Sequence, residues 1–329
     1  MFSDITSIIK DSTNQWRLEC DIRHYSCGYT HIQQIGDNGS QITFLPNHLI
    51  KKVVMPRMRS SKKGDNGIVI IIGGSRIYHG APILASMAAL RSGTDLVYTA
   101  IPRSILVAVR CFSPNLIALP MPDDKLTVGS VNNLIKTIPR NAHSAAIGMG
   151  MSIAKSEALL SLIRQLKNNG TKLLLDASAL IPDVLKEISG TNTIITPHMG
   201  EYKRIFSGDN ISEVTTEKER ISNVHRFARK YGITILLKGS VDIISDGEYV
   251  AINKMHNCAM TVGGTGDVLS GLTAGFLSKL KPFDASILGV YFNGVAGNLV
   301  YNRLGLHIVA SDLIESLPKA MKQFDLIKQ

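Results

Sequence analysis

The stretch TVGGTGDVLSGLTAGF, residues 261–276, carries the strongest structural signal in the chain. Leu269, Leu272 and Phe276 follow helical spacing, so the sequence predicts a helix that begins near Gly266. The glycines in front of this helix remove side chains from the turn and leave its backbone N–H groups open. Open N–H groups at the positive end of a helix dipole bind phosphoryl groups well. An anion site at the start of this helix is therefore predicted.

The first turn of the same helix contains an acidic residue, Asp267. A carboxylate at this position can accept a proton from a substrate hydroxyl. A glycine-rich turn followed by an acidic residue also has a purely structural interpretation, because the helix dipole favours negative charge at that end. The combination of Gly263, Gly264, Thr265, Gly266 and Asp267 favours phosphate chemistry, with Asp267 as the candidate base.

From about residue 64 onward, short apolar segments alternate with helical stretches. Segments that are apolar throughout indicate strands buried on both faces, hence a largely parallel sheet covered by helices in one large domain. The predicted strands are Ile68–Ile72, Leu96–Ala100, Ala145–Ile147, Lys172–Asp176, Thr193–Thr196 and Ile233–Leu237, and the predicted helices are Ala81–Ser92, Ile153–Asn168, Glu213–Tyr231 and Asp267–Leu280. Asp246-Gly247, between Val241–Ser245 and Glu248–Ile252, predicts one antiparallel hairpin on this sheet.

Residues 1–50 differ from this pattern, and we treat them as an N-terminal extension of unknown role before a domain that spans residues 51–329. Within the extension, Asn38-Gly39 predicts a hairpin turn. Four potential metal ligands also fall close together there: Cys20, His24, Cys27 and His31. A Cys-x6-Cys spacing is not a standard zinc pattern and no second cysteine pair follows it. An appendage packed on the main domain is favoured, and no metal site is predicted.

Composition limits the class of protein. The 329 residues are 44% hydrophobic and 19% charged, which excludes a chain that is disordered throughout. Lys and Arg number 36 against 26 Asp and Glu, a net charge of +10. No nucleic-acid-binding motif accompanies this charge, so a solvated basic surface or attraction of a polyanionic small molecule is favoured and nucleic acid is not a predicted partner. No apolar run approaches the roughly 20 residues of a membrane span, and no signal peptide or disulfide pattern is evident. These features predict a soluble cytoplasmic protein that does not bind membranes.

A second glycine-rich motif, GGSRIYHGAP at residues 73–82, follows a buried strand and enters a helix. Its glycines allow a ligand to approach the backbone, and Pro82 suits a first helical turn. The motif is not a Rossmann fingerprint, and the absence of any Gly-Lys pair excludes a Walker A loop. Lys238-Gly239 and TPHMGE at residues 196–201 also follow strands. On their own these two signals leave ligand contact and an ordinary strand-ending loop equally open.

Six motifs occur in the order typical of one family: GGSxxYxGAP (73–82), GxG (148–150), LLLDA (173–177), TPHxGE (196–201), LKG (237–239) and GGTGD (263–267). Over about residues 55–320 the chain resembles the ADP/ATP-dependent NAD(P)H-hydrate dehydratases of the ribokinase-like superfamily. GGTGD alone is compatible with several ribokinase-like kinases, whereas GGSxxYxGAP together with TPHxGE is more specific. The resemblance implies a ribokinase-like three-layer α/β/α sandwich with a largely parallel central sheet.

This resemblance also implies a repair function. Hydrated NADH or NADPH carries a hydroxyl on its damaged nicotinamide ring, and members of the family phosphorylate that hydroxyl with ADP or ATP and then eliminate phosphate. By resemblance, Gly264 and Gly266 would hold the transferring phosphoryl group and Asp267 would be the base. Mg²⁺ would bridge the nucleotide phosphates without a dedicated protein cage.

The remaining expectations about the site follow from the resemblance as well. Residues expected to contact the adenine nucleotide are Lys238, Gly239, Ser240, Val241, Asp242 and Gly266. Residues expected to line the site of the hydrated dinucleotide are Ala81, Gly148 or Gly150, His198 and Asp267. A homotetramer is implied too.

Four positions depart from the family pattern: Met149, Ser178, Asn293 and Asn298. None of them is the candidate base. Two other functions remain open, a ribokinase-like kinase acting on a hydroxymethyl vitamin precursor or sugar, and a non-catalytic nucleotide-binding protein. A kinase leaves a stable phosphoester, whereas the dehydratase restores reduced nicotinamide absorbance and releases phosphate. The retained Asp267 and GGTG turn argue against a non-catalytic protein.

Overall fold

The computed structural model describes residues 8–10, 16–18, 30–36, 39–44, 50, 53–209 and 216–329, with the backbone alone for the strands before residue 50. Three of the four potential metal ligands in the N-terminal segment, Cys20, His24 and Cys27, lie outside these residues. For His31 only the backbone is described. Among the described residues, none of the helices combines the length and hydrophobicity needed to span a bilayer.

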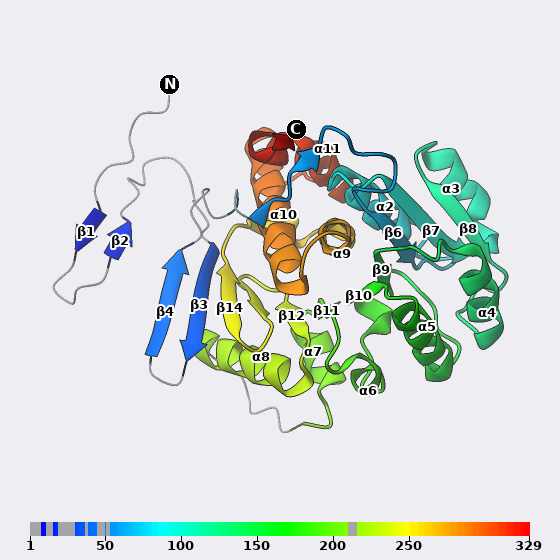
Figure 1. Cartoon of the computed structure of the whole chain (residues 1–329), viewed down its shortest axis with the longest axis horizontal. Coiled ribbons are helices and arrows are strands. Elements are labelled where there is room, and N and C mark those ends of the chain that lie inside the picture. The colour runs from blue at the N-terminus through cyan, green and yellow to red at the C-terminus, as the bar shows by residue number, and fades with distance from the viewer. Residues whose placement is uncertain are drawn as a thin grey trace.

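An eleven-stranded sheet runs through the molecule (Figure 1). From one edge to the other its strands are β4 (Gly39–Phe44), β3 (Thr30–Gly36), β14 (Tyr249–Asn253), β13 (Asp242–Ser245), β12 (Thr234–Leu237), β11 (Thr193–Ile195), β10 (Lys172–Leu175), β9 (Ser144–Ile147), β6 (Ile68–Ile72), β7 (Leu96–Pro102) and β8 (Ile117–Met121). The strands from β12 to β8 are parallel to their neighbours. The largely parallel sheet is confirmed.

The antiparallel part of the sheet is larger than expected. The predicted hairpin is present as β13 and β14, and β12 pairs with β13 in the same antiparallel sense. The hairpin predicted around Asn38-Gly39 is also present, as β3 paired with β4. Beyond that prediction, β3 pairs with β14 and so extends the central sheet. Two short pairs lie outside it: β1 (Ile8–Lys10) with β2 (Trp16–Leu18), and β5 (Arg57–Met58) with β15 (Ile327–Lys328).

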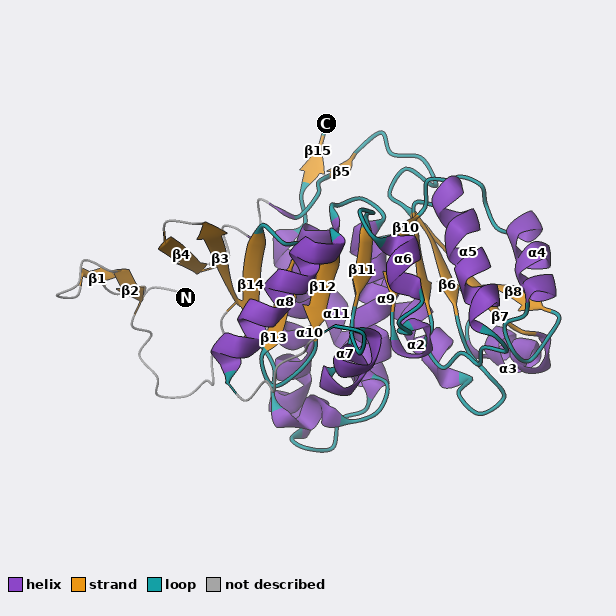
Figure 2. Ribbon diagram, turned by 90° about the horizontal axis from the view of Figure 1, so that it is seen from below, coloured by secondary structure: helices purple, strands orange, loops and turns teal. Residues whose placement is uncertain are grey.

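Helices cover both faces of the sheet (Figure 2). In β6, Val69 and Ile71 face one hydrophobic core, while Ile68, Ile70 and Ile72 face the other. The first core contains side chains of α2 (Gly80–Arg91), α9 (Thr265–Leu277), α10 (Pro282–Leu304) and α11 (Ala310–Met321). The second core contains side chains of α4 (Val128–Thr137), α5 (Ser156–Asn168), α6 (Val184–Ile188), α7 (Met199–Ile205) and α8 (Glu217–Tyr231). Helix α3 (Leu106–Phe112) packs in a smaller cluster beside β7 and β8. The three-layer α/β/α prediction is confirmed.

The predicted helices agree with α2, α5, α8 and α9 to within a few residues at each end. The longest helix, α10, was not predicted. Its buried residues occur on nearly all sides, so the helical period of hydrophobic residues that reveals an amphipathic helix is absent.

Two glycines bring α2 and α9 into close contact. A Cβ added at Gly271 would lie 1.9 Å from the carbonyl oxygen of Ala85, and one at Gly275 would lie 2.1 Å from Oγ of Ser92. These positions are four residues apart and therefore share one face of α9. Any side chain there would separate the helices that follow the two glycine-rich motifs.

Helix α9 is also attached to the sheet near both ends of β10. At the first residue of the strand, Lys172 Nζ donates to the carbonyl oxygens of Leu277 (3.0 Å) and Leu280 (2.9 Å). After the strand, Asp176 Oδ2 accepts a hydrogen bond from Ser270 Oγ at 2.6 Å. The position of the glycine-rich turn is thereby fixed relative to the carboxyl ends of the strands.

Candidate active site

The motifs from the sequence meet at one end of the sheet, where the parallel strands finish. Gly74 N donates to the carbonyl oxygen of Met149 at 2.8 Å, which joins the segment after β6 to the segment after β9. Lys238 N donates to the carbonyl oxygen of Pro197 at 2.8 Å, which joins the segments after β12 and β11. The carboxyl ends of the strands are the usual ligand-binding edge of open α/β sheets.

The turn before α9 has the geometry of an anion cradle. Gly264, the N-cap, has φ of +93°, and a Cβ there would lie 2.6 Å from Leu84 Cδ1, so a glycine is required. A Cβ at Gly263 would meet no atom within 4 Å. Thr265 Oγ1 donates to the carbonyl oxygen of Met260 at 2.8 Å and holds the turn in place. No side chain caps the first turn of α9, so its N–H groups face the open side.

Asp267 lies in the first turn of α9. The pKa of its carboxyl group is raised to about 6: burial is the largest cause, the negative charge of Asp176 adds to it, and the positive charge of Lys238 opposes both. A carboxylate with such a pKa is mostly ionised at neutral pH and is a stronger base than an ordinary aspartate. The side chain predicted as the base therefore has the electrostatics of one.

A buried ion pair stands beside this turn. Lys238 Nζ lies 2.8 Å from Oδ1 of Asp176, with both side chains largely inaccessible. Burial alone would lower the pKa of Lys238, but Asp176, with smaller contributions from Glu201 and Asp267, outweighs it, so the pKa is raised and the ammonium stays charged. The same Nζ is 3.7 Å from the position that a Cβ would take on Gly266. Lys238 thus brings a positive charge to the predicted phosphoryl site.

Sequence reasoning did not assign a role to Asp176 or Ser270. Asp176 is the last residue of the predicted strand and belongs to the LLLDA motif. Its position directly after a buried parallel strand is the signal that could have marked it, because that edge of the sheet is where ligands bind. Ser270 carries no such signal, since it looks like any small residue of an apolar helix.

The segment predicted to contact the nucleotide forms a tight turn after β12. Asp242 Oδ1 accepts a hydrogen bond from Gly239 N at 3.1 Å, and Asp242 Oδ2 accepts one from Asn253 Nδ2 at 2.9 Å. Burial is the main cause of a raised pKa at Asp242, which these hydrogen bonds oppose. Asp242 therefore shapes the turn, whereas Lys238 reaches Gly266.

Two basic residues that the sequence did not single out pack against this turn. Arg220 Nη2 donates to the carbonyl oxygen of Val241 at 3.1 Å, and its buried Nε has no hydrogen-bond partner among the described residues. A ring nitrogen of His256, Nε2, lies 2.6 Å from the carbonyl oxygen of Ser240. Both residues come from elements distant in sequence, so no local motif indicates them.

His198 caps helix α7 and leaves part of its ring exposed. Its Nδ1 accepts hydrogen bonds from Gly200 N (3.0 Å) and Glu201 N (3.3 Å), which places the ring proton on Nε2. The Glu201 carboxylate accepts from His198 N at 2.9 Å. His198 also forms a parallel β-bridge with Lys238. The imidazole, 61% exposed, is therefore held in a fixed orientation, and the backbone of His198 lies beside that of Lys238.

The two glycines of the GxG turn have different neighbours. Gly150 has φ of +63°, and a Cβ there would lie 3.0 Å from Cβ of Ala81, so these two predicted substrate residues are adjacent. Gly148 has φ of +121°, and a Cβ there would lie 2.0 Å from the carbonyl oxygen of Asp176. Gly150 faces the helix that carries Ala81, whereas Gly148 lets the chain pack on the segment after β10.

The four residues that depart from the family pattern lie in different surroundings. The side chain of Met149 is fully buried, and the backbone of this residue, not its side chain, contacts Gly74. Asn298 Oδ1 accepts a hydrogen bond from Asn257 Nδ2 at 2.8 Å. The Oδ1 of Asn293 is buried without a hydrogen-bond partner in the described part of the chain. Nothing in the structure explains the serine at position 178.

Solved structures define the class of protein. The chain is similar to a ribokinase-like superfamily protein from Enterococcus faecalis V583, with a TM-score of 0.72, 24% identity, and coverage of 85% of this chain and 95% of that one. It is equally similar to an ADP/ATP-dependent NAD(P)H-hydrate dehydratase from Bacillus subtilis co-crystallised with ATP and Mg²⁺, with a TM-score of 0.72, 24% identity, and coverage of 85% and 98%. The fold is ribokinase-like.

Sequence comparison narrows this class to one family. A family model for NAD(P)H-hydrate dehydratase matches residues 69–319. The ADP-dependent (S)-NAD(P)H-hydrate dehydratase of Nitrosopumilus maritimus (strain SCM1) is 50% identical over 284 residues, which cover 86% of this chain and 98% of that protein. The chain belongs to the NAD(P)H-hydrate dehydratase family.

Proposed function

We propose that this protein is an ADP-dependent (S)-NAD(P)H-hydrate dehydratase, which returns damaged, hydrated NADH or NADPH to the reduced dinucleotide. The observation that carries the proposal is the position of Asp267, a buried carboxylate with raised pKa in the first turn of α9, directly after an uncapped glycine turn. Membership of the family and the 50% identity to an ADP-dependent relative support the reaction and the donor.

In the proposed first step, Asp267 accepts the proton of the ring hydroxyl while the hydroxyl oxygen attacks the terminal phosphorus of ADP. The products are the phosphorylated hydrate and AMP. In the second step the C–O bond to phosphate breaks, the neighbouring ring carbon loses a proton, and the ring double bond is restored. Phosphate is a far better leaving group than hydroxide, which is the chemical reason for spending a nucleotide on a dehydration.

The chain offers two groups that stabilise the migrating phosphoryl group. One is the set of N–H groups at Gly263–Asp267, which combine hydrogen bonding with the positive end of the α9 dipole. The other is the ammonium of Lys238, held by Asp176. Both are fixed before the substrates bind, so they do not have to reorganise during transfer.

The residues at the site also fit magnesium as a companion of the nucleotide. The described residues contain no group of three or more His, Cys, Asp or Glu side chains able to hold a metal ion. Mg²⁺ commonly keeps several waters and binds through substrate phosphates, so it needs no protein cage here. When bound, it would neutralise phosphate charge. The dinucleotide would lie toward Ala81, Gly150 and His198.

The test is an incubation of the purified protein with hydrated NADH, Mg²⁺ and either ADP or ATP. Recovery of the reduced-nicotinamide absorbance, with one AMP formed per NADH from ADP, is the expected result. Consumption of the donor with a stable phosphorylated hydrate and no recovered absorbance would support the kinase alternative. Binding of the nucleotide without any turnover would support the non-catalytic alternative.

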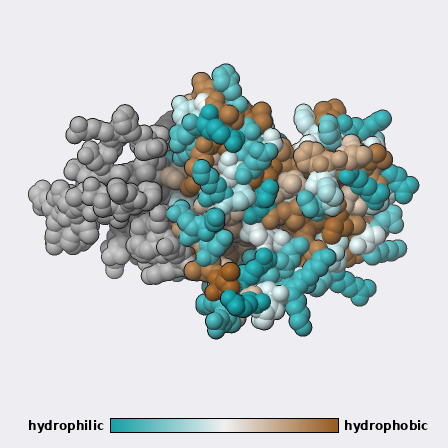
Figure 3. Space-filling view, turned by 90° about the horizontal axis from the view of Figure 1, so that it is seen from above, coloured by the Kyte–Doolittle hydropathy of each residue, from teal (hydrophilic) through white to brown (hydrophobic). Residues whose placement is uncertain are grey.

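We further propose that the protein acts as a homotetramer in the cytoplasm, with residues 51–329 as the catalytic domain. An apolar surface supports self-association: Val107 and Phe112 on α3 are 72% and 57% exposed, and Ile117 starts the edge strand β8. Hydrophobic side chains gather at the end of the molecule that carries these elements (Figure 3). Light scattering coupled to size exclusion measures the mass, and Phe112→Glu is expected to reduce it.

A further inference from the structure

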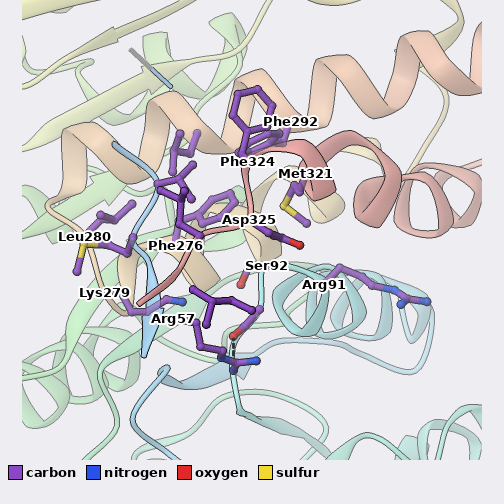
Figure 4. A pocket seen from close by; sticks show the side chains of 16 residues that line it. Arg57, Arg91, Ser92, Phe276, Lys279, Leu280, Phe292, Met321, Phe324 and Asp325 are labelled. Atoms are coloured by element: carbon purple, nitrogen blue, oxygen red, sulfur yellow. Dashed lines mark hydrogen bonds between the residues drawn. The ribbon is translucent and has the colours of Figure 1, made fainter. Parts of the chain in front are cut away.

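A cavity of about 340 Å³ opens at the end of α9 that is remote from Asp267 (Figure 4). Its walls come from the carboxyl ends of α2 and α9, the middle of α10, the end of α11 and the segment around β5. Three phenylalanines, Phe276, Phe292 and Phe324, form part of its apolar wall, together with aliphatic side chains and methionines. Ring centroids of Phe276 and Phe292 are 5.8 Å apart, and those of Phe292 and Phe324 are 5.3 Å apart. The volume is within the range of small-molecule sites, about 300–1,000 Å³.

Three cationic side chains line this cavity. One of them, Arg57, already has partners, and another, Arg91, extends away from the cavity. Arg57 donates to the carbonyl oxygen of Gly93 at 3.2 Å and pairs with Asp95. Arg91 is exposed and extends away from the other labelled side chains in Figure 4. Among the described residues that line the cavity, Asp325 is the only one with a carboxylate, and it is exposed.

Lys279 is the third cation, and the charges around it compensate its own charge only in part. Its side chain is partly buried, and its ammonium makes no hydrogen bond or ion pair with any described residue. Burial is the main cause of the lowered pKa of Lys279. The charge of Arg57 lowers this pKa further, and the charge of Asp95, which is paired with Arg57, opposes both without outweighing them. Figure 4 shows the amine end of Lys279 turned toward Arg57. A cation held against an apolar wall without a partner is costly, and an anionic ligand would remove that cost.

We propose that this cavity binds a small monoanion with a flat apolar body, of the class of aromatic carboxylates, with its carboxylate on Lys279 and its ring against the phenylalanine wall. One free cation matches one carboxylate, and edge-to-face contacts suit an aromatic body.

This site is separate from the catalytic one. Asp267 and Phe276 lie nine residues apart on α9, which is about 13 Å along the helix axis. The cavity and the phosphoryl site thus lie at opposite ends of one helix. Binding here is measured without turnover, so the inference does not depend on the proposed function.

The test compares two probes of equal shape on the full chain, 2-naphthoate and its neutral counterpart 2-naphthamide, by calorimetric titration. Naphthoate is expected to bind at least about tenfold more tightly than naphthamide, because a hydrogen bond to a charged group contributes about 1.5–3 kcal/mol. Saturating ADP and Mg²⁺ are expected to leave naphthoate binding unchanged. Equal affinity of the two probes, no binding of either, or displacement of naphthoate by ADP would each overturn the proposal.

Substitutions test whether Lys279 is the residue that binds the carboxylate of the ligand. Lys279→Gln is expected to weaken naphthoate binding at least about tenfold and to leave naphthamide unaffected, while Lys279→Arg keeps the affinity within about threefold. Lys319→Gln, on the exposed side of α11, is the matched control and is expected to bind as the unaltered protein does. Unchanged naphthoate affinity in a folded Lys279→Gln protein would contradict the assignment.

Discussion

Lys238 and Asp176 form a buried ion pair, Nζ to Oδ1 2.8 Å, where β12 and β10 end beside the first turn of α9. The two charges act on Asp267 in opposite directions, because Asp176 raises its pKa and Lys238 lowers it. The pair therefore adjusts the strength of the base in addition to holding the lysine in place.

Replacing Asp176 by Asn removes the charge that raises the pKa of Asp267. The acid limb of the kcat/KM profile is then expected to move to lower pH, by up to about one unit. The change also leaves Lys238 buried without its partner, at a cost of about 3 kcal/mol in the free energy of unfolding. Ser270→Ala is the control, since it removes one hydrogen bond to Asp176 but no charge. An acid limb that stays at the same pH in Asp176→Asn would contradict the coupling.

The unaltered protein is expected to lose activity in acid. A base must be deprotonated to work, and the pKa of Asp267 is raised to about 6. The kcat/KM value is therefore expected to be constant above that pH and to fall about tenfold per pH unit below it. Steady-state rates between pH 4.5 and 8 measure this. A profile that is flat down to pH 5 would exclude Asp267 as the base.

Asp267→Asn is expected to be less active but more stable. Loss of a general base lowers kcat by about 10²–10⁴. The folded-state pKa lies above the unfolded value near 3.8, so the ionised carboxylate destabilises the fold above pH 6. The asparagine protein is expected to gain about 1–3 kcal/mol at pH 8, and this gain shrinks as the pH falls from 6 to 4. Urea unfolding at pH 8 and at pH 4 measures this difference in stability. A loss of stability at pH 8 would indicate a structural role instead.

Substitutions at two neighbouring glycines test the shape of the turn and its role in phosphoryl binding separately. Gly264→Ala forces a side chain into φ of +93° and against Leu84, so a loss of at least about 1–3 kcal/mol is expected. Gly263 lacks a positive φ and faces open space, so Gly263→Ala is expected to keep its stability within about 0.5 kcal/mol.

The methyl group of Gly263→Ala nevertheless enters the space proposed for the phosphoryl group. It is expected to lower kcat/KM for the nucleotide at least about tenfold. Thermal unfolding and steady-state kinetics on both proteins separate the two effects. Full activity in a stable Gly263→Ala protein would place the phosphoryl group elsewhere.

The glycine turn could be predicted because its chemistry is local. Gly263–Asp267 are consecutive, and the accessibility of backbone N–H groups at a helix start depends on those few residues alone. The strands were predictable for a similar reason, since burial on both faces leaves an uninterrupted apolar run. Helix α10 has no such signal, because a helix buried on most sides has no polar face.

The ion pair depends on the topology of the sheet. Asp176 and Lys238 are 62 residues apart in sequence and meet because β10 and β12 both flank β11. No spacing in the sequence encodes that arrangement. The pairing of β3 with β14 is more distant still, so the hairpin at Asn38-Gly39 could be predicted but its attachment to the central sheet could not.

The anchoring of α9 at both ends of β10 determines where motion can occur. Lys172 and Asp176 prevent the helix from sliding along the strand, so the base keeps a constant position while substrates enter and products leave. We therefore expect any movement that admits the substrates to involve connecting loops such as residues 74–79, between β6 and α2. Substitutions in that loop are expected to alter substrate entry while the strand–helix unit is left untouched.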